Sequence, residues 1–388
     1  MPTRRLWLLL LCSLLVAGAA RLTVAAPEAC PAPSASEARA AASAGADWLV
    51  ANQRDDGTFA YQIDTQGRDQ GGYDNVRHAG AALALYDAAH ATDDRKYLDA
   101  ADRAVAWMID RLESRADWQA LPDGPTAPLG GSALMLSALA ERRDYTGDRQ
   151  FDDTMRALGR FIVAMQKPNG DYSVYYDLTT DRRDPVSISQ YYASESLWAL
   201  ARLQNALPDP AFRTSALRAA HFVATERDDR DFVPVGPLND HWAAYGFAEM
   251  AKWPLGADEI AYARQLQARF QLLIRWDAQK DSGAPYSWVH GPRRRSAALG
   301  TWVEGQAALA RLGSRDSRFA DLRVPARESA ACGAGVLVQR QRHGDDPTTA
   351  GAWFDSGHSR VDDQQHSIAG LIAVAELVDH SASADHHG

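Results

Sequence analysis

Titratable and aromatic side chains gather at the starts of several apolar segments of this sequence. Carboxylates, imidazoles and phenols can donate or accept protons in catalysis, so these residues are the first candidates for chemistry. The catalytic candidates are Tyr191, Glu195, Asp240, His241, Glu304 and Asp362. The candidates for substrate binding, which add one cation and further aromatic rings, are Tyr73, Arg77, His78, Tyr192, Trp242, Trp302, Asp363 and His366.

Two kinds of chemistry fit these residue types. Hydrolysis of a glycosidic bond needs one carboxyl group that protonates the leaving oxygen and a second that activates water or attacks the sugar. Elimination from a uronate needs a cation against the sugar carboxylate and a Tyr or His that removes a proton from carbon 5. Arg77, Tyr191 and His241 can supply the parts of an elimination, and the carboxylates above can supply those of a hydrolysis.

The segments that position these residues repeat. Asp, two variable residues and Tyr or Phe precede amphipathic stretches at Asp94–Tyr97, Asp148–Phe151, Asp209–Phe212 and Asp316–Phe319. Aspartate is a favourable helix N-cap because its carboxylate accepts the unpaired backbone N–H groups of the first turn. The aromatic residue then begins the apolar stripe of an amphipathic helix. The first two intervals, of 54 and 61 residues, are typical of a repeated helical hairpin.

Six further helices, more apolar around their whole circumference, are expected between the amphipathic ones. They begin near Val76, Gly130, Tyr191, Asp240, Leu299 and Val361. A helix that is apolar all round is buried, so the pattern predicts hairpins that each pair an outer helix with a buried one. We therefore predict an all-α, single-domain (α/α)6 toroid, with a seven-hairpin ring and an open superhelix as alternatives. The inner helices of such a ring run in one direction, so their polar N-termini open on one face.

A turn motif links the chain to a known group of folds. Gln, three residues, Gly, one residue and an aromatic residue occur at Gln53–Phe59 and at Gln166–Tyr172. The motif resembles the QW-type repeat of terpenoid cyclases, and the repeat layout resembles that of the six-hairpin toroids over essentially the mature chain. That group includes glycoside hydrolases, polysaccharide lyases, sugar 2-epimerases, terpenoid cyclases and lanthionine cyclases. The resemblance therefore implies a fold and leaves the reaction open.

Motifs distinguish some members of this group. A protonating terpenoid cyclase has the sequence D-x-D-D, where this chain has Arg360-Val361-Asp362-Asp363. A lanthionine cyclase binds zinc through a Cys-Gly and a Cys-His pair, of which only Cys332-Gly333 is present, and we expect no metal and no other cofactor. Sugar epimerases of this fold use histidines on inner helices. The histidines available for such a role are His78, His241 and His366.

The N-terminus has the layout of a secretory signal peptide. Arg4 and Arg5 precede an apolar run over residues 6–20, and small residues at 24–26 offer a cleavage site. We expect a signal peptide over residues 1–26, the toroid domain over 27–380 and a disordered tail over 381–388, in a periplasmic or secreted protein. Cys30 and Cys332 would be the cysteines left after cleavage, and we expect them to form a disulfide between the two ends of the domain.

The remaining features limit the classes of molecule with which the protein can interact. A formal charge of −9 argues against nucleic acid, and we expect no membrane span after cleavage. We expect a monomer that acts on a poly- or oligosaccharide as an exported carbohydrate-active enzyme of the glycoside hydrolase or uronate lyase type. The alternatives are a non-catalytic glycan-binding accessory protein of an exopolysaccharide pathway and a terpenoid-cyclase-like protein with an aromatic-lined pocket.

Overall fold

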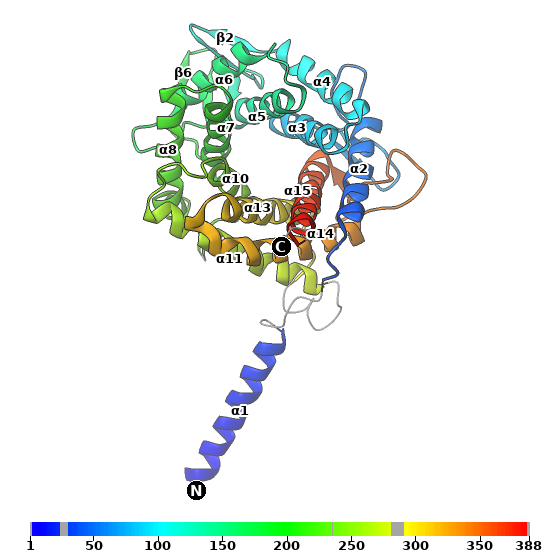
Figure 1. The fold of residues 1–388 in the computed structure, drawn as a ribbon, viewed down its shortest axis with the longest axis vertical. Helices are drawn as coiled ribbons and strands as arrows, with labels where there is room; N and C mark the ends of the chain where they lie inside the picture. Colours follow the sequence, from blue (N-terminus) through cyan, green and yellow to red (C-terminus); the bar gives the residue numbers. More distant parts are fainter. Residues whose placement is uncertain (1, 24–29, 235, 281–290, 386–388) are drawn as a thin grey trace.

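The computed structural model describes residues 2–23, 30–234, 236–280 and 291–385. Within these ranges the helices form a ring of two layers (Figure 1). The outer layer consists of α2 (Ala35–Ala51), α4 (Arg95–Ile109), α6 (Asp152–Met165), α8 (Pro210–Thr225), α11 (Ala257–Gln279) and α14 (Arg323–Arg340). The inner layer consists of α3 (Asn75–Thr92), α5 (Leu129–Thr146), α7 (Tyr192–Ala206), α10 (His241–Glu249), α13 (Ser296–Arg315) and α15 (Val361–Asp385).

The ring is closed by its last hairpin. Each inner helix packs against the next one along the chain, and α15 packs against both α13 and α3. All six inner helices begin within three residues of the predicted positions. The predicted (α/α)6 toroid is therefore confirmed for the described residues, and neither a seven-hairpin ring nor an open superhelix is formed.

Three of the four Asp-x-x-aromatic segments cap a helix as predicted. Asp94, Asp209 and Asp316 each accept the backbone N–H two residues further on, at 2.7–3.0 Å, and each following aromatic ring is buried. The segment at Asp148 differs, because α6 begins only at Asp152. Asp148 instead shapes the preceding turn and pairs with Arg142 of α5 at 2.9 Å.

Both Gln-x3-Gly-x-aromatic segments form the same turn after an outer helix. The glutamine Nε2 donates to the carbonyl of the motif's own glycine at 3.2 Å and to a carbonyl of the next outer helix at 2.9 Å. Gly57 and Gly170 have positive φ angles of 87° and 98°, and a Cβ on either would lie 2.4 Å from a carbonyl oxygen of that helix. The motif therefore fastens α2 to α4 and α6 to α8.

Short structure that the sequence patterns do not predict lies in the loops that lead into the inner helices. β1 (Gln62–Asp64) pairs antiparallel with β7 (His358–Arg360), and β2 (Glu113–Arg115) pairs with β3 (Trp118–Ala120). β4 (Thr126–Pro128), β5 (Tyr175–Asp177) and β6 (Arg182–Arg183) form a third small antiparallel sheet. A one-turn helix, α9 (Arg227–Arg230), precedes α10, and a 3-10 helix, η2 (Ser317–Leu322), precedes α14. Because most of these loops precede inner helices, they surround the N-terminal face of the ring.

The ends of the chain bear on the remaining predictions. α1 (Pro2–Thr23) lies outside the ring in Figure 1 and exposes its leucines. Among the described residues, no helix combines the length and apolarity needed to cross a membrane. Cys30 and Cys332 form the predicted disulfide, which joins the segment before α2 to α14. α15 extends to Asp385, and residues 386–388 of the predicted tail lie outside the described residues.

Candidate active site

The N-terminal ends of the inner helices surround a cavity of about 360 Å³. Its polar and aromatic lining comes from five of the six inner helices and the segments just before them. Those residues are Asp74, Arg77, Tyr191, Tyr192, Glu195, Asn239, His241, Trp242, Thr301, Asp362, Gln365 and His366. The sequence-predicted residues that the structure brings together here are Arg77, Tyr191, Tyr192, Glu195, His241, Trp242, Asp362 and His366.

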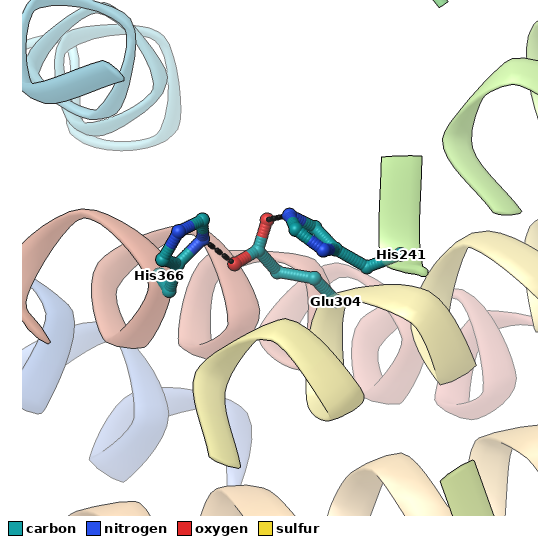
Figure 2. Close-up of side chains that lie close together, drawn as sticks. All are labelled: His241, Glu304 and His366. Carbon is teal, nitrogen blue, oxygen red and sulfur yellow. Dashed lines mark hydrogen bonds and ion pairs between the residues drawn. The ribbon is translucent and has the colours of Figure 1, made fainter. Parts of the chain in front are cut away.

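Two histidines and a glutamate meet at the floor of this cavity (Figure 2). The His366 Nδ1 donates to Glu304 Oε1 at 2.8 Å, and the His241 Nε2 lies 4.0 Å from Glu304 Oε2. The two imidazole rings are perpendicular, with centroids 5.0 Å apart. Tyr245, one turn after His241, donates its hydroxyl to Glu304 Oε2 at 2.9 Å. These contacts fix both rings at the centre of the ring of helices.

Burial sets the protonation of this cluster. It lowers the pKa of His241 well below its ordinary value, and the nearby His366 adds to the effect. His241 is therefore neutral at neutral pH. Its Nε2 is buried and has no hydrogen-bond partner among the described residues. Burial also raises the pKa of Glu304, although His366 and Tyr245 oppose that shift. A neutral imidazole with a free nitrogen can act as a base.

Glu195 brings a carboxyl group to the cavity wall. The side chain is buried and its Oε2 has no hydrogen-bond partner among the described residues. Burial raises the pKa of Glu195 to about 8, and the carboxylates of Asp240 and Asp74 contribute. Gly130 of α5 makes room for it, because a Cβ at that position would lie 2.4 Å from Glu195 Oε2. At neutral pH this group is a protonated acid that can donate a hydrogen bond or a proton.

Another part of the cavity lining, on α3 and α15, carries paired charges. Arg77 binds Asp74 Oδ2 at 3.0 Å and lies 3.3 Å from Asp362 Oδ2, and it also donates to the Tyr61 hydroxyl. Arg360 donates to the same Asp362 oxygen at 2.7 Å, while Asp362 Oδ1 is buried without a partner among the described residues. The positive charge of Arg77 is therefore matched by two carboxylates.

Two of the predicted aspartates serve the backbone and do not line the cavity. Asp240 is fully buried, accepts the N–H groups of the first turn of α10 at 3.1 and 3.3 Å, and pairs with Arg227. Asp363 accepts the Ala297 and Arg360 N–H groups at 3.1 and 3.0 Å and pairs with Arg295. Both hold inner-helix N-termini in place.

The other predicted residues also lie away from the cavity lining. His78 donates from Nε2 to the Ala104 carbonyl at 2.9 Å and hydrogen-bonds with the Tyr73 hydroxyl, behind α3. Burial lowers the pKa of His78 to about 4. Trp302 is buried in α13. Glu304 does not line this cavity itself, but it contacts His366 and lies 4.0 Å from His241, and both of these histidines do line it.

Several cavity residues were absent from the sequence-predicted set. Asp74, Thr301 and Gln365 belong to the same inner-helix N-termini as the predicted residues, and Asn239 immediately precedes Asp240. Tyr245, which contacts Glu304 and does not line this cavity, follows His241 by four positions, so the helical repeat places both on one face of α10. The position of a residue at the start of an inner helix could therefore have identified these cavity residues, whereas residue type alone could not.

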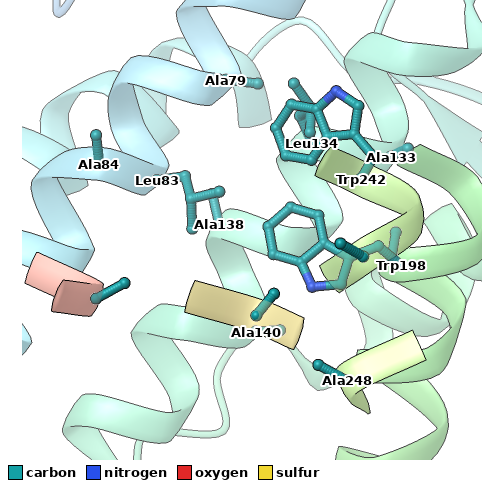
Figure 3. Packing of buried hydrophobic residues seen from close by; sticks show 14 of the residues in the cluster. Ala79, Leu83, Ala84, Ala133, Leu134, Ala138, Ala140, Trp198, Trp242 and Ala248 are labelled. Carbon is teal, nitrogen blue, oxygen red and sulfur yellow. The ribbon is translucent and has the colours of Figure 1, made fainter. Parts of the chain in front are cut away.

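Two tryptophans of neighbouring inner helices, Trp198 of α7 and Trp242 of α10, stack on one another. The rings of Trp198 and Trp242 stack with centroids 5.2 Å apart, and Figure 3 shows them among small side chains and leucines of neighbouring helices. A second cavity of about 300 Å³ lies at the C-terminal ends of the inner helices and shares Trp242 and Gln365 with the first. Glu304 lines this second cavity. Trp242 therefore lies between the two cavities.

Comparison with solved structures places the fold. A cellobiose 2-epimerase from Spirochaeta thermophila DSM 6192 matches with a TM-score of 0.62 and 15% identity, over 90% of this chain and 97% of that one. The fold is the six-hairpin toroid. An α-1,6-mannanase from Salegentibacter sp. HEL1_6 matches with a TM-score of 0.60 at 12% identity, over 88% of this chain and 99% of that one. A D-mannose isomerase has the same TM-score at 14% identity, over 88% and 97% of the two chains.

Neither a protein-family model nor a curated protein sequence matches this chain. At the identities above, the likeness to solved structures establishes the fold alone. The group of six-hairpin toroids predicted from the repeat layout is the one found.

Proposed function

We propose that the protein is a sugar epimerase or isomerase that moves the proton on carbon 2 of a neutral reducing sugar, with His241 and His366 as its acid–base pair. The observation that carries this proposal is the pair of perpendicular imidazole rings at the cavity floor, whose centroids lie 5.0 Å apart. Proton transfer next to a carbonyl needs one group that removes the proton and one that returns it. Two similar structures, a cellobiose 2-epimerase and a D-mannose isomerase, have names that describe such reactions.

The surroundings of the two histidines would determine which one acts as the base and which as the acid. The free Nε2 of neutral His241 takes the proton from carbon 2 of the open-chain sugar, and the electron pair moves onto the carbonyl oxygen to give an enediolate. His366, whose Nδ1 is hydrogen-bonded to Glu304 Oε1, returns a proton to the other face of carbon 2 or to carbon 1. The product is an isomer of the substrate, so no oxidant, reductant or net proton is needed.

The cavity walls suit a neutral sugar. The protonated Glu195 can donate a hydrogen bond to the developing oxyanion, and the rings of Tyr191, Tyr192 and Trp242 offer faces for stacking. Arg77 is already matched by Asp74 and Asp362, so it is a poor partner for a uronate carboxylate. This pairing weighs against the lyase alternative. A volume of about 360 Å³ lies at the small end of ligand sites, which favours a mono- or disaccharide end over a buried polymer.

Isotope exchange tests the proposal. The purified protein is incubated with neutral aldoses, ketoses and reducing disaccharides in D₂O, and carbon 2 is followed by NMR. We expect deuterium at carbon 2 of aldoses and at carbon 1 of ketoses, in product and in recovered substrate, and we expect this exchange to fall at least roughly 100-fold in His241→Asn and in His366→Asn. His343→Asn, at an exposed histidine outside the cavity, should match wild type. Absence of exchange with every sugar would overturn the proposal, and binding without exchange would favour the glycan-binding alternative.

A glycoside hydrolase remains a second candidate because of one observation. Glu195 keeps its proton up to about pH 8, and Asp362 retains a buried oxygen without a partner among the described residues, so the two supply a proton donor and a base. Release of new reducing ends from a neutral polysaccharide, abolished in Glu195→Gln and in Asp362→Asn but retained in His366→Asn, would favour hydrolysis. Export to the periplasm or beyond and a monomeric state remain predictions, of which the disulfide supports the first.

A further inference from the structure

The cluster at the cavity floor also has the composition of a metal site. One ligand atom each from His241, Glu304 and His366 lies within 4.8 Å of the others, and the three residues come from three different inner helices. Two imidazoles and one carboxylate are a ligand set that zinc and neighbouring divalent metals accept. Because the three side chains project from packed helices (Figure 2), their arrangement is largely preformed.

The separations are close to those that a metal needs. A tetrahedral site with bonds of about 2.0–2.1 Å holds its ligand atoms about 3.3 Å apart. The His366 Nδ1 and Glu304 Oε1 are 2.8 Å apart, and the His241 Nε2 and Glu304 Oε2 are 4.0 Å apart. Each distance is within an ångström of that value, and the carboxylate would also turn so that one oxygen, in place of the two that now make these contacts, bonds the cation. The proton now shared by His366 and Glu304 would be released when the cation takes its place.

One atom of the cluster points to a missing ligand. The His241 Nε2 is buried and has no hydrogen-bond partner among the described residues, and such an orphan calls for a partner. Tyr245 donates to Glu304 Oε2 at 2.9 Å, which is the kind of outer contact that orients a metal-binding carboxylate. Since His241 and His366 both line the cavity, a fourth coordination position would open toward it.

From this geometry we propose that His241, Glu304 and His366 bind a divalent transition metal of the zinc class, with its free coordination position toward the cavity. Metal binding does not depend on the proposed reaction. The effect of metal on activity does rest on the proposed function, because a metal bound to both imidazoles would make them unavailable as the acid and the base. Zinc would therefore inhibit carbon 2 exchange, and chelation would restore it.

The test uses the full mature chain without an affinity tag, freed of metal by a chelator. Cobalt(II) is titrated while its visible absorption is followed, and zinc(II) is titrated calorimetrically. We expect one site per chain with the intense absorption of four-coordinate cobalt. His241→Gln, Glu304→Gln and His366→Gln should each weaken binding by more than the roughly 10–100-fold that loss of an outer contact costs, and Tyr245→Phe should fall within that range. The control variant is His343→Gln, at an exposed position.

The outcomes separate the metal site from the proposed function. Absence of a stoichiometric site, or a site that the three ligand variants leave unchanged, overturns the metal proposal while carbon 2 exchange can still stand. A metal site in a protein that exchanges no sugar supports the metal proposal and removes the function. An apoprotein that is inactive until metal is added supports the site and overturns both the acid–base assignment and zinc inhibition.

Discussion

At the scale of one residue, the buried carboxyl group of Glu195 makes the folding stability depend on pH. In the unfolded chain its carboxyl group ionises near its ordinary pKa of 4.5, whereas burial and the facing carboxylates of Asp240 and Asp74 raise the pKa to about 8 in the folded protein. Between these values unfolding releases a proton, so folding stability falls as pH rises, by up to about 1.4 kcal/mol per pH unit. Below the lower value both states are protonated and this dependence vanishes.

The variant Glu195→Gln removes this titration. We expect the free energy of unfolding to fall less steeply between about pH 5 and 8 in Glu195→Gln than in wild type, so that the variant gains relative stability toward pH 8. Urea denaturation at several pH values measures it. Glu328→Gln, at an exposed position of α14, is the control and should follow wild type. Parallel pH profiles for Glu195→Gln and wild type would show that the group is ionised in the folded protein.

The residue scale is also where prediction from sequence reaches its limit. Asp240 and Asp362 look equivalent in the sequence, since each marks the start of an inner helix. The structure separates them because Arg227 pairs with Asp240, while Asp362 keeps an oxygen without a partner among the described residues. Helix starts and residue types predicted most of the cavity lining. They did not predict which carboxylates would only cap helices and pair with arginines, because that depends on how segments outside the inner helices pack, as Arg227 of α9 does against Asp240.

At the scale of elements, the N-terminus of α10 rests on a buried ion pair. Arg227 is fully buried and contacts Asp240, the Tyr262 hydroxyl and, at 3.2 Å, the Ser194 hydroxyl. Removing the guanidinium would leave the Asp240 charge buried without its partner, which typically costs about 3–5 kcal/mol. The pair thus positions His241, the first residue of α10, and in the proposed mechanism it takes no part in the proton transfer.

This assignment predicts a pattern in three variants. Arg227→Met should lower the free energy of unfolding by about 3–5 kcal/mol, and adding Asp240→Asn should recover much of it, because asparagine still caps the helix without a charge. Asp240→Asn alone should retain carbon 2 exchange per folded molecule. Denaturant unfolding and the exchange assay measure both quantities. Loss of exchange in folded Asp240→Asn would return Asp240 to the catalytic residues, as first predicted from the sequence.

Elements differ in how well the sequence predicts them. The amphipathic and buried helices extend over several turns, so the spacing of their apolar residues predicts both type and layer. The strands have two or three residues each, too few for a periodic pattern to appear. They form because the loops before the inner helices lie side by side once the ring is closed, which is a consequence of the fold and invisible in any local window.

At the scale of the whole molecule, the ring is closed by packing and by one covalent bond. The helices α15 and α3 join the last hairpin to the first, and the disulfide ties Cys30 to Cys332 across a sequence separation of 302 residues. Both the closure and the pairing could be predicted, because a repeat of fixed length brings the two ends of a ring together. The stacking of Trp198 on Trp242 could not be predicted, since it depends on which side chains of the inner helices meet at the centre of the ring.

Removing the disulfide should lower the stability of the protein and leave the candidate active site intact. A cross-link over so long a loop restricts the unfolded chain strongly, so the double variant Cys30→Ser/Cys332→Ser should lose about 2–5 kcal/mol of unfolding free energy. Because the cavity residues lie on inner helices that pack against one another, its carbon 2 exchange and cobalt binding should persist below the unfolding transition. Guanidinium unfolding of wild type with and without a reductant provides the comparison, and the reduced wild type should match the variant. An unchanged midpoint would mean that inner-helix packing alone closes the ring, whereas loss of cobalt binding in the folded variant would mean that the bond also sets the geometry of the floor.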